Sequence, residues 1–360
     1  MQPLHTVLRA NTALAATAET FTNDLPVNPL SVIIVTLRAL NNLATVGANY
    51  LGSAADLISK IATMSVRYRG ATIIDGNPLN LTQIYGMLSG WWPNQGQINQ
   101  VNNDVRSVSF PILFSRKAFD PDECFPASRR GDLVLSVTTA ADPTGLDGFD
   151  MTFETVELLD ATPTKFIKVT STAFSLLSGD VNDITLPIGN KLIGILLRAG
   201  LYPETTSNNA GFNEVALKVD NVEVEYSRAF WRGLHALWAR RARMDWLTVG
   251  HRHLIDIAAS TTDPVLATTA LGLSGTAAAG SALITGNDAS TLGHTGIAPA
   301  PEIAELQRYG YVDLDLNSDL SMALDTKGAA DINLHVNSSA ADTGAIILPI
   351  EFVETGGAQS

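Results

Sequence analysis

The chain has 360 residues, of which 46% are hydrophobic and only 16% are charged, and its formal net charge is −13 at pH 7. This length allows one large or two medium domains, and the low charge predicts extensive burial in a core or in subunit contacts. The negative charge argues against a protein that coats nucleic acid through a general basic face. The single cysteine excludes an internal disulfide framework and a thiolate zinc site.

The first residues and the short apolar runs predict where the protein is made. Arg9, Asn11 and Thr12 interrupt the apolar region that a signal peptide requires. The longest apolar runs, such as 32–35, are far shorter than the roughly 18 residues needed to cross a bilayer. We therefore expect a soluble protein that is made in the cytosol and is capable of self-association.

Residues 1–28 are polar, rich in Ala and Thr and without clear periodicity, which predicts an arm that becomes ordered against another surface. The strand patterns begin with the β-branched run SVIIVTLRAL (31–40). A short helix is predicted after Ser53, and a second one carries Leu81 to Leu88 on one face. Four further strand patterns follow: SVSFPILF (107–114), DLVLSV (132–137), FDMTFETVELL (149–159) and TKFIKVTSTAF (164–174).

The second half continues the β pattern. The stretch DITLPIGNKLIGILLRA (183–199) predicts a hairpin, and the polar, turn-rich stretch 201–214 predicts a domain boundary. Alternation resumes at Val215, while residues 258–301, dominated by Ala, Gly, Ser and Thr, predict long surface loops with weak strands. Three strand patterns close the chain before a flexible tail at 356–360.

One repeat links the two halves. The stretch GDLVLSVTTAADPTG (131–145) aligns with ADINLHVNSSAADTG (330–344), so that Asp132 matches Asp331 and the alternating apolar positions coincide. Each stretch lies between two other strand patterns. The alignment predicts two copies of one β-unit, with a chance similarity between alternating strands as the alternative.

Two β-rich halves, each with about eight short strands, fit an all-β fold of two jelly rolls side by side with a few short inserted helices. The sequence resembles the double jelly-roll major capsid proteins of icosahedral, membrane-containing viruses, particularly those of bacteriophages. The resemblance covers residues 30–355 in pattern, without one specific motif, and departs in the Ala/Gly-rich segment and in the Trp/Arg-rich stretch 227–246. The stretches that carry it are 58–80 with the strand and helix before it, 109–137, 184–200 and 326–352.

The resemblance implies a structural role with no catalysis and no cofactor. It implies homotrimers whose six jelly rolls form a pseudo-hexameric tile, joined to neighbouring capsomers and to other capsid or vertex proteins in an icosahedral shell over an internal membrane. The partners would include lipids or proteins of that membrane, without sequence-specific nucleic-acid binding. The expected location is the virion, after synthesis in the host cytoplasm. The expected segments are an arm (1–28), a first jelly roll (29–205), a second jelly roll (206–355) and a flexible tail (356–360).

The stretch SRAFWRGLHALWARRARMDW (227–246) places apolar residues at helical spacing among several arginines. Ser227 is the predicted N-cap, and arginines towards the far end favour the helix dipole. One interpretation is a helix packed on a jelly roll with its arginines solvated or paired with acidic loops. The functional interpretation is an inter-subunit anchor, ahead of lipid or nucleic-acid contact, because Trp and Arg are enriched at interface hot spots. The candidate interface residues are Trp91, Trp92, Trp231, Trp238, Arg240 and Arg241.

A different function would follow if His251 and His253 bound a metal, as His-x-His does in the cupins, which are jelly-roll enzymes. The cupin pattern also needs a nearby glutamate and a distant histidine, whereas here only Asp256 follows closely and His294 lies in a loop-like stretch. The alternative functions are thus a bicupin-like metalloenzyme using His251 and His253, and a β-sandwich binding or spike module.

Two remaining motifs are interpreted as structural. Cys124 is flanked by Asp122 and Glu123, which raise the pKa of a thiol, so we expect it to be inert. The tripeptide Arg-Gly-Asp at 130–132 is an adhesion signal in other settings. Only its aspartate recurs in the second half, at Asp331, so we interpret it as the start of a strand.

Overall fold

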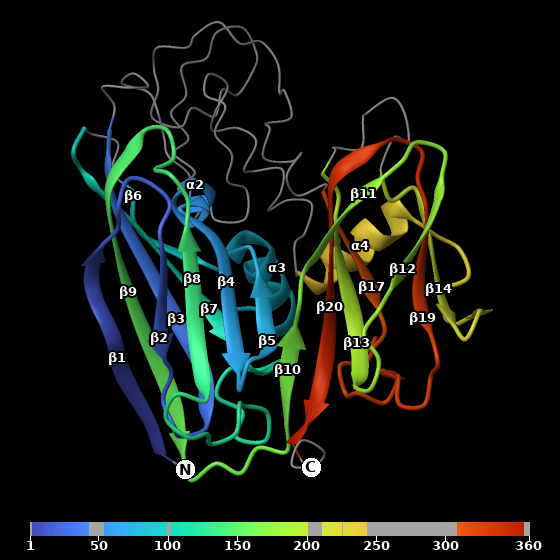
Figure 1. Cartoon of the computed structure of the whole chain (residues 1–360), viewed down its shortest axis with the longest axis horizontal. Coiled ribbons are helices and arrows are strands. Elements are labelled where there is room, and N and C mark those ends of the chain that lie inside the picture. The colour runs from blue at the N-terminus through green and yellow to red at the C-terminus, as the bar shows by residue number, and fades with distance from the viewer. Residues whose placement is uncertain are drawn as a thin grey trace, which may run out of the picture.

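The structure is a computed structural model, and the residues that it describes are 2–42, 54–98, 102–200, 211–224, 226–242 and 308–355. They form two lobes of β-strands side by side, with few and short helices (Figure 1). Within the described residues, no helix is both long enough and apolar enough to cross a membrane.

The first lobe consists of two antiparallel sheets packed face to face. Its elements are β1 (Gln2–Ala13), β2 (Thr20–Asp24), β3 (Leu30–Asn41), α2 (Ala54–Ser59), β4 (Ile61–Tyr68), β5 (Ala71–Gly76), α3 (Pro78–Ser89), β6 (Asn94–Ile98), β7 (Val105–Leu113), β8 (Leu133–Thr139) and β9 (Leu146–Leu159). One sheet has the strand order β1-β9-β3-β7-β6, and the other contains β2-β8-β4-β5. Both helices predicted in this half are present: α2 begins directly after Ser53, and α3 contains Leu81 to Leu88.

The second lobe repeats this arrangement. Its elements are β11 (Thr172–Leu176), β12 (Val181–Thr185), β13 (Lys191–Arg198), β14 (Glu214–Val219), β15 (Val222–Glu223), β16 (Ala229–Phe230), α4 (Trp231–Arg241), β17 (Tyr309–Asp313), β18 (Leu324–Asp325), β19 (Ile332–Asn337) and β20 (Asp342–Glu354). One sheet follows the order β11-β20-β13-β17, and the other follows β12-β19-β14-β15.

The strand order identifies both lobes as jelly rolls. Counted along the chain and leaving aside β6, β16 and β18, the strands of each lobe run first-eighth-third-sixth in one sheet and second-seventh-fourth-fifth in the other. This order in two packed sheets is that of two Greek keys, which make a jelly roll. The all-β fold with two jelly rolls that the sequence predicts is therefore confirmed.

The repeat between the two halves is the seventh strand of each jelly roll, β8 and β19. Both strands bury alternate residues, and a hydrogen bond before each strand also repeats. The carbonyl oxygen of Asp132 accepts from the N–H of Arg69 at 2.7 Å, and that of Asp331 accepts from the N–H of Asp220 at 2.9 Å. Arg69 and Asp220 sit at the turn after the fourth strand with φ of 50° and 51°. The repeat thus preserves a turn geometry as well as a strand.

The expected N-terminal arm is part of the first jelly roll. Within residues 1–28, β1 pairs with β9 and β2 pairs with β8, so these segments are the first and second strands of the fold. Because β1 lies at the edge of its sheet and exposes most of its side chains, its sequence lacks the apolar alternation of an inner strand. The interpretation as a separate arm is corrected accordingly.

The expected boundary at 205/206 does not follow the strand pairing. Strands β11, β12 and β13, all before residue 205, pair with β17, β19 and β20 of the second lobe. The buried side chains Leu192 and Ile195 share one apolar cluster with Val215 and Leu334. The polar stretch 201–214 therefore separates two strands of one jelly roll, and the division between the lobes lies between β9 and β11.

Strand β10 (Lys165–Val169) lies at this division and joins the lobes. It pairs along its length with β20, and Val169 also pairs with Ile74 of β5. The second sheet of the first jelly roll and the first sheet of the second thereby form one continuous sheet.

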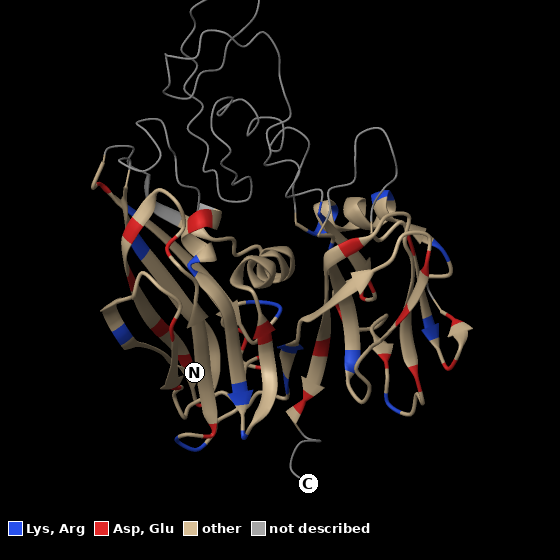
Figure 2. Cartoon of the chain, turned by 45° about the horizontal axis from the view of Figure 1, so that its top comes forward, with Lys and Arg blue, Asp and Glu red and all other residues tan. Residues whose placement is uncertain are grey.

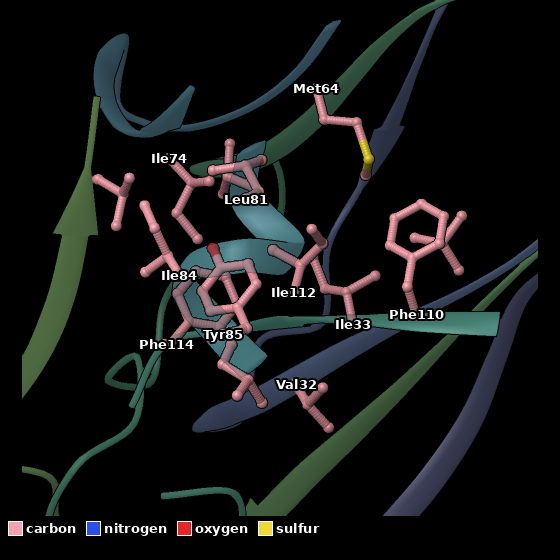
Figure 3. Packing of buried hydrophobic residues seen from close by; sticks show 14 of the residues in the cluster. Val32, Ile33, Met64, Ile74, Leu81, Ile84, Tyr85, Phe110, Ile112 and Phe114 are labelled. Carbon is pink, nitrogen blue, oxygen red and sulfur yellow. The ribbon is translucent and has the colours of Figure 1, made fainter. Parts of the chain in front are cut away.

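Helix α3 closes the core of the first lobe. Asn77 caps its first turn by accepting a hydrogen bond from the N–H of Leu79, and Gly90 ends it in the left-handed conformation. Figure 3 shows Ile84 and Tyr85 of the helix among buried side chains of β3, β5 and β7. The apolar face predicted from the helical spacing therefore packs inward.

Candidate assembly surfaces

Four of the six candidate interface residues lie on α4, which begins later than predicted. Phe230 is the N-cap residue and makes no side-chain capping bond, so the expected cap at Ser227 is wrong. The reason is that Ala229 and Phe230 pair with β14 as the short strand β16, which keeps the backbone extended up to Trp231. Arg240 and Arg241 lie in the last turn, where a positive charge favours the helix dipole.

The tryptophans of α4 are core residues. Trp231 is 6% exposed and stacks on Phe212 with ring centroids 5.7 Å apart. Trp238 is 1% exposed and stacks on Tyr309 at 5.8 Å and on His235 at 5.5 Å. Side chains this deeply buried present no surface to a second subunit, so their expected interface role is corrected. The alternative interpretation, a helix packed on the jelly roll, describes them.

His235 supports this packing as a neutral ring. Its Nδ1 lies 2.8 Å from the carbonyl oxygen of Tyr309, which only a protonated Nδ1 can donate to. Burial lowers the pKa of His235, and the hydrogen bond to Tyr309 offsets part of that shift.

The two arginines in the last turn of α4 differ in role. Arg241 donates two hydrogen bonds to the carboxylate of Asp313, at 2.6 and 2.8 Å, and further bonds to the carbonyl of Asp315 and the hydroxyl of Ser318. These hydrogen bonds hold the end of α4 against β17, whose last residue is Asp313. Arg240 is exposed and has no ion pair within the described part of the chain, so its interface role stays a prediction.

A second arginine extends this network across the two lobes. Arg116, from the segment after β7, donates to Glu123 at 2.5 Å and to the carbonyl of Ser318 at 2.8 Å, and its guanidinium lies 3.4 Å from Asp315. Burial opposes the charge on Arg116, but hydrogen bonding to Glu123 and the nearby carboxylates outweigh it and raise the pKa of Arg116. A cavity of about 50 Å³ lies between Arg116 and Arg241.

Sequence reasoning missed this network, because its members are far apart along the chain. Arg116 and Asp315 are separated by 199 residues, and nothing in either local pattern indicates a partner in the other lobe.

Trp91 and Trp92 follow α3 and are partly buried. The ring of Trp92 covers Gly86 so closely that an added Cβ there would lie 2.3 Å from a ring carbon. The ring of Trp91 lies 5.9 Å from that of Phe119, which is 44% exposed. The pair therefore packs against the end of α3, and both side chains keep some exposed surface, so their interface role stays a prediction.

The histidines of the metal hypothesis, His251 and His253, lie outside the described residues, as do Asp256 and His294. Among the residues that the structure describes, no group of three or more His, Cys, Asp or Glu side chains could hold a metal ion.

The structure also places Cys124 and the Arg-Gly-Asp tripeptide, the two motifs interpreted as structural. Cys124 is buried, and burial together with the charges of Asp120 and Asp122 raises its pKa to about 12. Asp132 of the Arg-Gly-Asp tripeptide pairs with Arg69 at 3.0 Å. The thiol is therefore protonated at neutral pH, and the aspartate ties the start of β8 to the β4–β5 turn.

Comparisons with known proteins identify the fold. No family model matches the sequence, and no curated protein matches it. Among solved structures, the STIV major capsid protein is 13% identical and aligns over 100% of this chain and 99% of that chain, with a TM-score of 0.64. A chain of Sulfolobus turreted icosahedral virus is 15% identical over 100% of this chain and 93% of that chain, at 0.63. The major capsid protein P2 of bacteriophage PM2 is 10% identical over 98% of this chain and 97% of that chain, at 0.54.

The chain has the double jelly-roll fold of these viral capsid proteins. The alignments extend over both lobes, so the shared fold is the pair of jelly rolls and not a single sandwich. One similar structure comes from a Sulfolobus virus and another from a bacteriophage. The fold is therefore shared by viruses of different hosts and does not point to bacteriophages in particular.

Proposed function

We propose that this chain is the major capsid protein of an icosahedral virus. Three copies would form a pseudo-hexameric capsomer, and capsomers would assemble with each other and with vertex proteins into a shell over an internal membrane. The protein works by self-assembly, without catalysis, a cofactor or sequence-specific nucleic-acid binding, and it resides in the virion after synthesis in the host cytoplasm.

One observation carries the proposal: the chain contains two jelly rolls of identical strand order, held in one orientation. The continuous sheet through β10 and the ion pair between Arg116 and Asp315 join the lobes. Three such chains related by a threefold axis present six near-equivalent lobes around that axis, which is what a hexagonal tile requires. The similar solved structures that are named as major capsid proteins carry the same pair of jelly rolls.

The test is the mass and shape of the purified protein. Light scattering after gel filtration is expected to give about three times the chain mass of 38.2 kDa. Electron microscopy is expected to show hexagonal particles or shells. A protein that stays monomeric from micromolar to millimolar concentration, with no assembly under any salt condition, would contradict the proposal.

The internal membrane and the metal alternative have separate tests. Purified particles are expected to contain phospholipid inside the protein shell, and lipid-free particles would remove the membrane from the proposal. A stoichiometric metal ion in the purified protein, lost in the His251→Ala/His253→Ala double variant, would favour the bicupin-like enzyme instead.

A further inference from the structure

A histidine, an aspartate and a lysine meet on the outer face of the second jelly roll. His335 lies on β19 between the buried residues Leu334 and Val336, so its ring points away from the core. Asp183 is directly opposite it on the edge strand β12, and Lys218 comes from β14 on the other side of β19. These strands lie at the end of the molecule away from the first lobe (Figure 1), and Figure 2 shows Lys/Arg and Asp/Glu colours close together there.

Both partners of His335 meet the same ring nitrogen. Its Nδ1 is 2.6 Å from Oδ1 of Asp183 and 3.1 Å from Nζ of Lys218. A ring nitrogen that carries a proton donates to a carboxylate, and one without a proton accepts from an ammonium group. Nδ1 cannot do both, so only one of the two contacts is a hydrogen bond at any moment. The proton on Nδ1 therefore decides which neighbouring strand the ring is tied to.

The other charged groups on this face lie beyond Lys218. Glu223 of β15 is the cross-strand neighbour of Lys218. Glu214, further along β14, is paired with Arg228 at 2.9 Å. The outward neighbours of the ring on β19 itself are two uncharged asparagines. The carboxylate of Asp183 and the ammonium group of Lys218 are therefore the charges that act directly on the ring.

Exposure decides which partner a neutral ring keeps. The side chain of Asp183 is 54% exposed, so its carboxylate can turn into water with little loss. Lys218 is less exposed, and a ring N–H pointing at its ammonium group would bring hydrogens of like charge together. Lys218 also has three N–H donors, so it can bind the ring and Glu223 at once. A neutral ring is therefore better matched to Lys218 than to Asp183.

We propose that His335 is a pH-operated switch on this face. The neutral ring accepts a hydrogen bond from Lys218 and ties β19 to β14. The protonated ring donates to Asp183 and ties β19 to the edge strand β12, while Lys218 is repelled and keeps Glu223. Histidine changes charge near neutral pH, and protonation of histidines operates other pH sensors in this way. The switch is a property of the single chain and goes beyond the proposed function.

The first jelly roll lacks the switch at the matching position. The repeat aligns β8 with β19, so Ser136 takes the place of His335 and pairs with Thr22 on β2. The cation recurs, since Arg67 takes the place of Lys218. Protonation near neutral pH therefore changes this face in the second jelly roll, and the matching faces of the two lobes differ in their response to pH.

NMR of protein labelled with ¹⁵N at its histidines tests the switch, since ring nitrogens with and without a proton differ widely in chemical shift. The His335→Gln variant assigns the signal. At about pH 8, where a free imidazole is neutral, Nδ1 of His335 is expected to lack a proton. In acid, both ring nitrogens are expected to carry one. A neutral ring with its proton on Nδ1 would overturn the proposal, because the ring would then bind Asp183 in both states.

The Lys218→Met variant removes the partner of the neutral ring. At about pH 8 the proton of this variant is expected to move to Nδ1, because the ring then donates to Asp183. His5, which lies 3.6 Å from Glu154 on the first jelly roll, is the control in the same spectra, and its signal is expected to stay unchanged. A proton distribution on His335 that is the same in both proteins would mean that Lys218 does not set it, which contradicts the switch.

Hydrogen exchange of β12 measures the protonated state. In acid, the pair of His335 and Asp183 is expected to slow exchange of the β12 amides by about two- to fivefold relative to neutral pH, after correction for the intrinsic rates. The Asp183→Asn variant keeps the shape of the side chain and is expected to lose this slowing. Equal slowing in the variant and in the wild type would also refute the switch.

The switch and the proposed function fail separately. Wild-type protein that never forms trimers, but shows the expected proton positions on His335, overturns only the capsid proposal. Trimers in which neutral His335 keeps its proton on Nδ1 overturn only the switch. Thermal unfolding of every variant checks that the fold is intact.

Discussion

The ion pairs of Arg116 are expected to make a large contribution to the stability of the junction between the lobes. Replacing Arg116 with Met keeps the apolar stem of the side chain and removes the charged guanidinium. Glu123 and Asp315, whose side chains are each 6% exposed, then lose a partner at 2.5 and 3.4 Å. Removing one member of a buried pair costs about 3–5 kcal/mol. Lys165 lies 3.9 Å from Glu123, and this remaining cation reduces the expected loss to about 2–3 kcal/mol.

The assay is guanidinium unfolding at fixed protein concentration, with Arg129→Met as the matched control at an exposed arginine. The control is expected to change the free energy of unfolding by less than about 0.5 kcal/mol. The double variant Arg116→Met/Glu123→Leu is expected to lose less than Arg116→Met alone, because it leaves one fewer buried charge unpaired. An Arg116→Met protein as stable as the control, or a double variant that loses the sum of the two single losses, would refute this reasoning.

Three further perturbations test the first core and α4. Lys60 is fully buried and its Nζ donates to two backbone carbonyls and to Asp142, so Lys60→Met should cost about 2–4 kcal/mol in urea unfolding, and a loss below about 1 kcal/mol would contradict it. Gly86→Ala should displace the ring of Trp92, cost about 1–3 kcal/mol and shift tryptophan fluorescence, whereas an unchanged spectrum would speak against this packing. Because burial lowers the pKa of His235, unfolding takes up a proton at acidic pH, so stability should be level above about pH 6.5 and fall below it. His235→Phe should flatten that decline, and an unaltered pH profile would count against the assignment.

Local patterns are sufficient to predict the inner strands and the duplication. The alternation in β8 and β19 reflects burial on one face of a sheet, and the match of Asp132 with Asp331 marks a turn that both jelly rolls share. Edge strands carry no such signal, since β1 has few buried side chains to impose a period. This is why the sequence of the first two strands predicts an arm.

Properties that depend on contacts between distant segments cannot be predicted in the same way. A polar stretch such as 201–214 signals a connection, but composition does not tell whether the strands on either side share a sheet. The burial of Trp231 and Trp238 has the same origin, because an amphipathic helix with arginines fits a core or an interface equally well until Phe212 and Tyr309 are seen to cover the rings. The partner of Arg116 is likewise set by tertiary structure alone.

Strand β10 has a mechanical consequence for any assembly of this chain. It is hydrogen-bonded to β20 on one edge and to β5 on the other, and the ion pair between Arg116 and Asp315 also connects the two lobes. A change in the angle between the lobes would have to break both connections at once. The two lobes therefore behave as one rigid body. In a shell made of such chains, curvature would come from changes at the contacts between chains. Each chain would keep the same shape at every position in the lattice.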